Sequence, residues 1–249
     1  MNNHVRDHSF LLRCIPRETV SQKIVEYHFT MEPNLFPNRS VDAFGNRLLS
    51  GHIPHAHRYL DYSVHGIVDR DDVRQKSDWM AIYRYASPMT KPDTGLQKFF
   101  LQCQRETVGV TDPLKVADRF MDLLFERMSY VKNSTDVSIT AAEAFQKGTG
   151  VCQDYTHIFL SLLHQASIPC RYIAGLAFDE GETHSWAEVW DGQYWYGFDP
   201  TNNRRMDERS IILAQGRDSQ DCSLNRGVMF GSYTKQMQLV ESRLEELAF

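Results

Sequence analysis

Residues that favour β-strands alternate or cluster along the first third of the chain. Four segments rich in such residues stand between stretches that hold Pro, Asn and Gly, which interrupt strands. The predicted strands are residues 10–16 (FLLRCIP), 22–33 (QKIVEYHFTMEP), 58–70 (RYLDYSVHGIVDR) and 79–88 (WMAIYRYASP). Short strands with such turns between them indicate a small antiparallel sheet or a sandwich.

From about residue 93 the apolar positions recur every three or four residues, which is the period of an amphipathic helix. Two helical segments follow, LQKFFLQC at 96–103 and DPLKVADRFMDLLFERMSYV at 112–131. In the second segment Asp112 suits the N-cap, and Pro113 suits the first helical position. The change of period therefore marks the start of a second structural region.

The stretch between the two patterns, SPMTKPDTG at residues 87–95, is the best candidate for a domain boundary because it is rich in residues that favour turns. We therefore expect a β-rich N-terminal domain over residues 1–90 and a second domain over residues 91–249.

Two helical signals in the second region bracket a cysteine. Thr140 and Glu143 in SITAAEAFQKG fit a capping box, and Gly148 can end that short helix in a left-handed conformation. An apolar stripe at helical spacing follows, made of Tyr155, Ile158, Phe159, Leu162, Leu163 and Ala166. Cys152 precedes Tyr155 by three residues, so it continues the stripe at the N-terminus of the predicted helix.

After Pro169 the pattern is again that of strands, over residues 170–178, 184–190 and 193–198. Asp191 and Gly192 separate the last two, and Asp-Gly between strands favours a hairpin with a two-residue type I′ loop. In that register Trp190 faces Gln193, and His184 falls directly opposite Asp199. Directly opposed side chains share a sheet face and lie close enough to interact. The final segment, YTKQMQLVESRLEEL, fits a strand or a helix equally well.

An imidazole beside a carboxylate and a thiol at a helix N-terminus are the parts of a nucleophilic site. The carboxylate of Asp199 would fix the tautomer of His184 and stabilise its imidazolium. The unpaired N–H groups and the dipole at the helix N-terminus would stabilise a Cys152 thiolate. The backbone N–H of Cys152 would also point toward the oxygen of an attacked carbonyl. Gln153, Gln146 or an aromatic side chain could supply a second donor.

Composition and charge narrow the possible partners. The chain has 249 residues, of which 42% are hydrophobic, and a formal net charge of −5, so we expect no nucleic-acid partner. Charged residues interrupt the apolar runs of the first twenty residues, and no apolar stretch is long enough for a membrane span. We therefore expect a cytoplasmic protein with no membrane partner. The sequence leaves the oligomeric state open.

The remaining cysteines and histidines have simpler interpretations. The five cysteines are odd in number and widely spaced, which favours free thiols over disulfides or a zinc site. His52, His55 and His57 in GHIPHAH invite comparison with a metal site, but only His55 and His57 share a strand face and no acid or cysteine completes the set. We expect no metal and no cofactor.

Two longer stretches resemble a known family. GTGVCQDYTHIFLSLLHQASIPCRYIAGLAF at 148–178 and THSWAEVWDGQYWYGFDPTN at 183–202 resemble the transglutaminase-like superfamily of papain-type cysteine enzymes. On the family pattern Cys152 matches the nucleophile, His184 the base and Asp199 the orienting acid. More loosely, residues 41–68 resemble the β-rich region that precedes this domain in bacterial members, and residues 215–228 resemble their C-terminal segment.

The resemblance implies an α+β fold with a papain-like core, in which the catalytic helix packs on an antiparallel sheet after a β-rich N-terminal domain. It also implies a cysteine-dependent hydrolase, a peptidase or amidase, that cleaves a peptide or protein substrate through a thioester acyl-enzyme. Two alternatives stay open. One is acyl transfer to an amine, as in transglutaminases, and the other is a binding module that keeps the fold without the chemistry. No acidic loop resembles the calcium site of the large animal enzymes.

Overall fold

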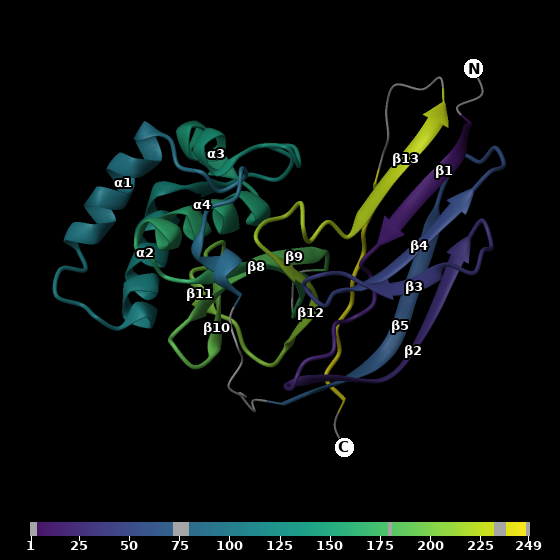
Figure 1. The fold of residues 1–249 in the computed structure, drawn as a ribbon, viewed down its shortest axis with the longest axis horizontal. Coiled ribbons are helices and arrows are strands. Elements are labelled where there is room, and N and C mark those ends of the chain that lie inside the picture. Colours follow the sequence, from purple (N-terminus) through teal and green to yellow (C-terminus); the bar gives the residue numbers. More distant parts are fainter. Residues whose placement is uncertain (1–3, 72–79, 179–180, 232–237, 248–249) are drawn as a thin grey trace.

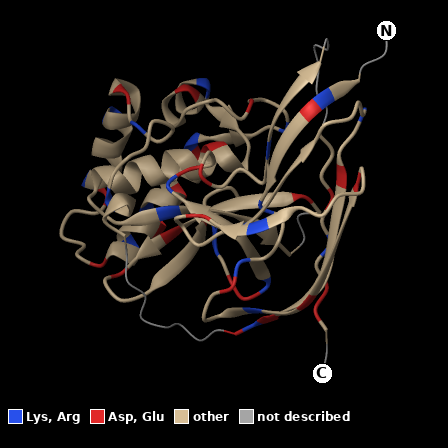
Figure 2. Cartoon of the chain, turned by 45° about the vertical axis from the view of Figure 1, so that its right-hand side comes forward, with Lys and Arg blue, Asp and Glu red and all other residues tan. Residues whose placement is uncertain are grey.

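The computed structural model describes residues 4–71, 80–178, 181–231 and 238–247. Helices gather over one end of the molecule and two β-sheets form the other end (Figure 1). A five-stranded sheet lies between them and carries the helices on one face. Acidic and basic residues are interspersed along the ribbon (Figure 2).

Four α-helices and one short 3-10 helix occur in the described residues. Their bounds are η1 Ala81–Arg84, α1 Thr94–Arg105, α2 Pro113–Arg127, α3 Ala141–Lys147 and α4 Cys152–Gln165. The predicted start of α2 and both predicted ends of α3 are confirmed, whereas α2 ends at Arg127, before the end of the predicted segment 112–131. Asp112 caps α2 by accepting a hydrogen bond from the Leu114 N–H at 2.9 Å. Thr140 and Glu143 form the capping box of α3, and Gly148 follows it with a φ of 71°. No described helix is both long and apolar enough to cross a membrane.

The N-terminal region is a sandwich of two antiparallel sheets. One holds β1 (Val5–Leu12), β3 (Asn38–Val41), β4 (Arg47–Ile53) and β13 (Asn225–Gly231), in the order β13-β1-β4-β3. The other pairs β2 (Gln22–Glu32) with β5 (Asp61–Arg70). Side chains from both sheets, among them Phe10, Leu12, Met31, Leu49 and Ile53, form one buried cluster. The sandwich predicted from the strand pattern is confirmed.

One predicted strand is wrong. Within WMAIYRYASP the structure has the 3-10 helix η1, because Tyr83 is the one η1 residue that is buried and its ring packs edge-on against Trp195. A strand would need every second side chain buried on one face. β3 and β4, on the other hand, lie in a segment for which the sequence had predicted no strand. β3 is exposed at all four residues, and β4 is buried only at Leu49 and Ile53, so neither shows a regular alternation.

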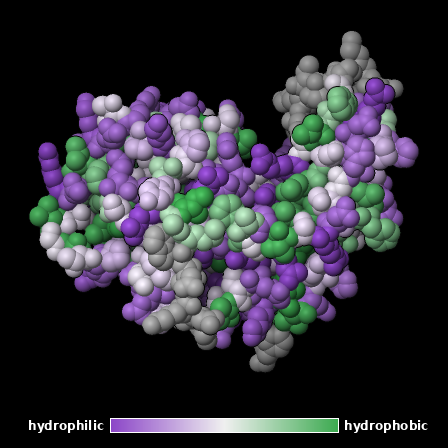
Figure 3. Space-filling view, viewed as in Figure 1, coloured by the Kyte–Doolittle hydropathy of each residue, from purple (hydrophilic) through white to green (hydrophobic). Residues whose placement is uncertain are grey.

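The chain returns to the N-terminal sheet near its end. β13 pairs antiparallel with β1 and forms an edge of that sheet, although no strand was predicted there. Apolar residues reach the surface of these sheets (Figure 3), and in β13 Val228 and Phe230 are exposed. The division into domains 1–90 and 91–249 stays a prediction, and residues 225–231 lie with the first region in space. Of the final segment, residues 232–237 lie outside the described residues and residues 238–247 are neither strand nor helix.

The central sheet carries the elements of the predicted papain-like core. Its strands β8 (Cys170–Ala177), β9 (Thr183–Trp190), β10 (Trp195–Asp199), β11 (Arg204–Arg205) and β12 (Ser210–Gly216) lie in the order β11-β10-β9-β8-β12. α4 packs on β8 and β9, and α2 packs on β9 and β10. A parallel pair of short strands, β6 (Ser129–Tyr130) and β7 (Thr149–Gly150), precedes α4. The core is α+β, as predicted.

Two buried amide side chains join the N-terminal region to the edge strand of the central sheet. The Gln22 side chain donates to the Ile212 carbonyl and accepts from the Ile212 N–H, both at 2.8 Å. The Asn46 side chain makes the same pair of bonds with Gln215, also at 2.8 Å. Both amides are fully buried. They therefore take the place of a neighbouring strand beside β12. They hydrogen-bond backbone N–H and C=O groups that an edge strand would otherwise leave unpaired.

Replacing Asn46 by leucine is expected to destabilise the protein by about 2–4 kcal/mol, because the N–H and C=O of Gln215 would then be buried without partners. Urea unfolding at neutral pH measures this loss. Asn38→Leu is the matched control, since Asn38 is exposed on β3 of the same region, and a surface change is expected to stay within about 0.5 kcal/mol. Equal midpoints for the two variants would refute a joining role for Asn46.

Candidate active site

α4 begins at Cys152, in a tight approach to the preceding strand. The carboxylate of Asp154 accepts the Val151 N–H at 2.8 Å and the Thr135 hydroxyl at 2.6 Å. A Cβ on Gly150 would lie 2.7 Å from the Asp154 side chain, so this approach requires glycine. Burial raises the pKa of Asp154 despite these hydrogen bonds. Cys152 itself is half-buried, as the first residue of the helix.

The hairpin that carries His184 and Asp199 does not have the predicted register. Trp190 pairs with Trp195 and Ala187 with Phe198, so the two-residue loop at Asp191-Gly192 is wrong. The carboxylate of Asp191 accepts the N–H groups of Gln193 and Tyr194, both at 2.7 Å, and this stabilises a longer loop.

The true register differs from the predicted one by two residues. Because side chains alternate with a period of two, such a slip leaves every side chain on its original face. His184 and Asp199 are therefore diagonal neighbours on one face of the sheet, and not directly opposed. Diagonal neighbours remain within reach of long side chains.

His184 lies in contact with Asp199. The imidazole Nε2 is 3.0 Å from Asp199 Oδ2, and both side chains are almost fully buried. Burial opposes the imidazolium charge, but hydrogen bonds with Asp199 and with the Cys152 thiol outweigh it and raise the pKa of His184 to about 10. Since Nε2 faces Asp199, Nδ1 is the ring nitrogen that can hydrogen-bond the Cys152 thiol. The structure thus brings the three predicted residues together.

Asp199 is held by more donors than the sequence had suggested. Its Oδ1 accepts the Thr201 N–H at 3.1 Å. Its Oδ2 accepts from the Asn202 amide at 2.8 Å and from Arg204 Nε at 3.3 Å, besides the contact with His184. Burial alone would raise the pKa of Asp199, but His184, Asn202 and Arg204 hold it below the usual range. The spacing of Asn202 from Asp199, which suits a turn closed by the aspartate, is the one sequence signal for these partners.

Hydroxyl groups link the first turn of α4 to the strand that carries the imidazole. Thr156 Oγ1 donates to the Cys152 carbonyl at 2.9 Å and lies 3.4 Å from Ser185 Oγ. Ser185 also hydrogen-bonds the hydroxyl of Tyr172, whose pKa is raised by burial and by the nearby Cys152. These contacts fix the start of α4 against β9 next to His184.

The four other cysteines differ from Cys152 in their surroundings. All five thiols are free. Burial raises the pKa of Cys14 and of Cys103 to about 12, and it raises the pKa of Cys170 and of Cys222 well above the usual range. Buried thiols with raised pKa values are unreactive at neutral pH.

The side chains considered as further site residues point elsewhere. The Gln153 amide donates to the Val137 carbonyl at 3.3 Å, and the Gln146 amide donates to Asp93 at 2.5 Å. His157 is buried within α4, accepts the Ser219 N–H at 3.1 Å and has its pKa lowered to about 4 by burial. The amides of Gln153 and Gln146 are therefore both engaged in other hydrogen bonds.

Of the histidines of GHIPHAH, His52 lies in β4 and His57 forms a β-bridge with Val5 outside the named strands. His57 Nε2 lies 3.0 Å from Nδ1 of the buried His8, and His52 Nδ1 lies 3.1 Å from the Ser9 hydroxyl. The contact between His57 and His8 was not predicted, because the two residues are far apart in sequence. Across the described part of the chain, no three His, Cys, Asp or Glu side chains are grouped to hold a metal ion.

Comparison with known proteins identifies the family. A model of the transglutaminase-like superfamily matches residues 102–200, and a model of the bacterial transglutaminase-like N-terminal region matches residues 2–69. An uncharacterized protein of Mycobacterium tuberculosis is 26% identical over 86% of this chain and 79% of its own length. An uncharacterized protein of Mycobacterium leprae is 30% identical over 46% of this chain and 44% of its own.

A solved structure shares the whole fold. The crystal structure of a "Putative Cysteine Protease" from Cytophaga hutchinsonii matches with a TM-score of 0.78 at 19% identity. The match covers 99% of this chain and 89% of the other. At this level of identity the likeness concerns the fold alone. With both family models matched in the expected order, over more than half of its length, the chain belongs to the transglutaminase-like superfamily.

Proposed function

We propose that this protein is a cysteine-dependent hydrolase that cleaves a peptide or amide bond through a thioester acyl-enzyme. The observation that carries the proposal is the buried contact of 3.0 Å between His184 and Asp199, beside Cys152 at the start of α4. An imidazole held by a carboxylate and facing a thiol is the arrangement that activates a sulfur nucleophile.

In the proposed reaction the proton of the Cys152 thiol resides on His184, and the thiolate attacks the carbonyl carbon of the substrate. The carbonyl oxygen takes up the negative charge near the backbone N–H groups at the start of α4. When the tetrahedral intermediate collapses, the C–N bond breaks and His184 protonates the leaving amine. Water, deprotonated by His184, then attacks the thioester, releases the acid and restores the thiol. Asp199 holds the imidazole throughout.

The surroundings of the thiols support this proposal. Cys152 is half-buried, whereas Cys103, Cys170 and Cys222 are buried and have raised pKa values. Five free thiols in one chain also fit a reducing compartment, in line with the cytoplasmic location that the sequence predicts.

Labelling with iodoacetamide, followed residue by residue with mass spectrometry, tests the proposal. In the native protein at neutral pH we expect Cys152 to be labelled more than about tenfold faster than any other cysteine. Cys103 is the internal control, because it is a buried thiol with a pKa of about 12. His184→Gln is expected to slow the labelling of Cys152 at neutral pH. Labelling of Cys152 that is slow at neutral pH, and rises only near pH ~8.5 as in an ordinary thiol, would instead indicate a binding module.

A further inference from the structure

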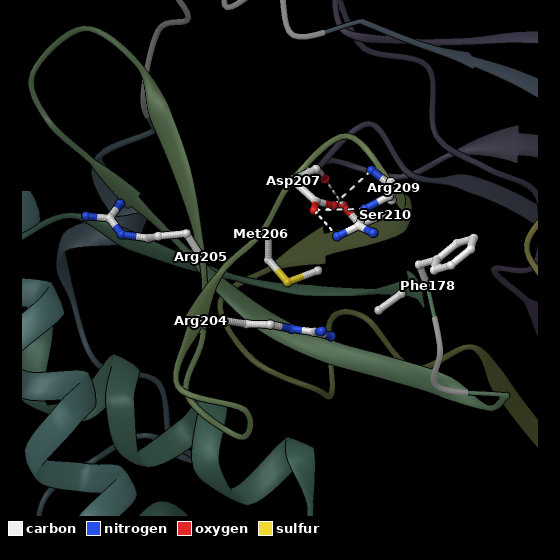
Figure 4. A pocket seen from close by; sticks show the side chains of 8 residues that line it. Phe178, Arg204, Arg205, Met206, Asp207, Arg209 and Ser210 are labelled. Carbon is white, nitrogen blue, oxygen red and sulfur yellow. Dashed lines mark hydrogen bonds and ion pairs between the residues drawn. The ribbon is translucent and has the colours of Figure 1, made fainter. Parts of the chain in front are cut away.

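A pocket of about 160 Å³ is lined in part by Arg204, whose Nε lies 3.3 Å from the carboxylate of Asp199. Its lining includes Ala177 and Phe178 at the end of β8, Arg204 and Met206 in and after β11, and Arg209 and Ser210 at the start of β12 (Figure 4). Its volume is well above the ~30 Å³ that one water molecule occupies in the liquid. The pocket therefore admits a small polar group.

The strand pairing places this pocket on the same sheet face as His184. Arg204 is the β11 partner of Asp199, so the two side chains share a face of the sheet. Met206 packs with Trp186, which lies two residues after His184 on β9. A Cβ on Gly197 would lie 2.6 Å from Met206, so the glycine lets the chain cross this close above the sheet. The crossing of residues 206–209 forms one wall of the pocket.

Three arginines line the pocket, against one acidic residue, Asp207. Arg205 is turned away from it (Figure 4), because its guanidinium pairs with Asp118 of α2 at 2.7 and 2.9 Å and stacks over Phe198. Arg209 pairs with Asp207 at 2.7 and 3.0 Å. These two arginines are thus each held by one carboxylate.

Arg204 is placed differently. Figure 4 shows it extending along the sheet beneath Met206 in the direction of Phe178, and its side chain is 42% exposed. Its Nε lies 3.3 Å from Asp199 Oδ2, which is also 3.0 Å from His184. Two cationic groups therefore share one buried carboxylate. A second carboxylate in the pocket would add negative charge next to the guanidinium of Arg204.

We infer that this pocket is a subsite for a carboxylate of the substrate, and that the substrate is an acidic peptide. The inference rests on the proposed function and extends it to a substrate class. The planar guanidinium of Arg204 suits a carboxylate, to which arginine donates paired hydrogen bonds. The aliphatic and aromatic side chains of Ala177, Phe178 and Met206 would enclose the methylene groups that carry it.

The test measures peptide binding to the Cys152→Ala protein, which retains the pocket and cannot turn over. The two probes are acetyl-Ala-Glu-Glu-Ala-amide and acetyl-Ala-Gln-Gln-Ala-amide, which differ in charge and little in shape. Calorimetric titration at neutral pH and constant ionic strength gives both affinities. We expect the acidic peptide to bind at least about tenfold more tightly. Equal affinities would overturn the inference.

Two arginine variants of the Cys152→Ala protein distinguish binding in the pocket from general effects of charge on affinity. Adding Arg204→Gln is expected to bring the ratio of the two affinities close to one. Arg119→Gln is the matched control, because Arg119 is 39% exposed on α2 and pairs with Glu106 outside the pocket. It should leave the ratio unchanged. If Arg204 served only to hold Asp199, Arg204→Gln would lower stability without changing the ratio, and that result would also overturn the inference.

A further variant covers the case in which Arg204→Gln does not fold, and the labelling of Cys152 distinguishes the substrate class from the proposed function. Should Arg204→Gln fail to fold, as judged by circular dichroism, Arg204→Lys replaces it, and loss of the guanidinium fork is expected to lower the ratio at least about threefold. An unchanged ratio would again overturn the inference. The labelling of Cys152 in the otherwise unchanged protein reports separately on the proposed function. A protein whose Cys152 is reactive but which does not distinguish the peptides would therefore refute only the substrate class.

Discussion

Replacing Cys152 by alanine is expected to lower turnover by roughly 10⁴-fold or more, because the acyl-enzyme can no longer form. p-Nitrophenyl acetate is a suitable probe, since acetylation of the thiol releases a coloured product. Mass spectrometry of the wild-type protein should show an acetyl group on Cys152. With an added primary amine, the products tell whether water or the amine removes the acyl group, and we expect free acetate.

Loss of the imidazole should be as damaging as loss of the thiol. His184→Ala is expected to lower turnover by a factor similar to Cys152→Ala, and the double variant by no more than either, because the groups act as a unit. Cys103→Ala is the control, since that thiol is fully buried in the core and has no part in the proposed reaction. Undiminished turnover in Cys152→Ala would refute the proposed mechanism.

Asp199→Asn is expected to lower turnover by about 10³- to 10⁴-fold and to destabilise the protein by about 3 kcal/mol. The asparagine would no longer stabilise the imidazolium of His184. Its amide group would also face donors from Asn202 and Arg204, which now point at a carboxylate oxygen. Removing one member of a buried ion pair is costly, because it leaves the other charge buried without compensation.

The pH dependence of this variant follows from the two pKa shifts. The pKa of His184 is raised to about 10, so its contribution to stability is complete below its ordinary value and is lost as the pH rises through about 10. The pKa of Asp199 is lowered, so its contribution is present above its ordinary value and is lost as the pH falls through the lowered one. The pair therefore stabilises the protein across the neutral range, and the difference between wild type and Asp199→Asn should shrink at both ends.

Urea unfolding at several pH values, together with the pH profile of Cys152 labelling, measures these effects. In Asp199→Asn the burial of His184 is no longer opposed by the carboxylate, so its pKa falls, the Cys152 thiolate is stabilised less at neutral pH, and labelling rises only at higher pH. Asp207→Asn is the matched control, because Asp207 pairs with Arg209 at the surface and does not contact His184. Equal stability and equal profiles for the two variants would contradict the role given to Asp199.

Much of the local structure could be predicted because its causes lie within a few residues. The cap of α2 at Asp112 and the capping box of α3 follow from short hydrogen bonds between neighbours in sequence. The start of α4 at Cys152 follows from the apolar stripe of the helix, which Cys152 continues at its N-terminus. The same local patterns, read together with the family resemblance, identified Cys152, His184 and Asp199 as a set.

The predictions that were wrong depended on partners distant in sequence or on a choice between similar turns. Asp191-Gly192 permits a two-residue loop, but the Asp191 carboxylate closes a longer one and moves the register by two residues. η1 takes the place of a predicted strand where Tyr83 packs on Trp195, more than a hundred residues away. Nothing near residue 225 indicates that β13 pairs with β1 at the other end of the chain.

The sequence by itself therefore determined the helices, most of the strands of the central sheet and the side chains able to form a nucleophilic site, since these depend on periodicity and on neighbouring residues. Only the tertiary structure decided how those side chains meet. It placed His184 and Asp199 as diagonal neighbours, added Asn202 and Arg204 to the carboxylate, and joined β12 to the buried amides of Gln22 and Asn46. Such contacts join residues that are distant in sequence, so they depend on how the whole chain packs.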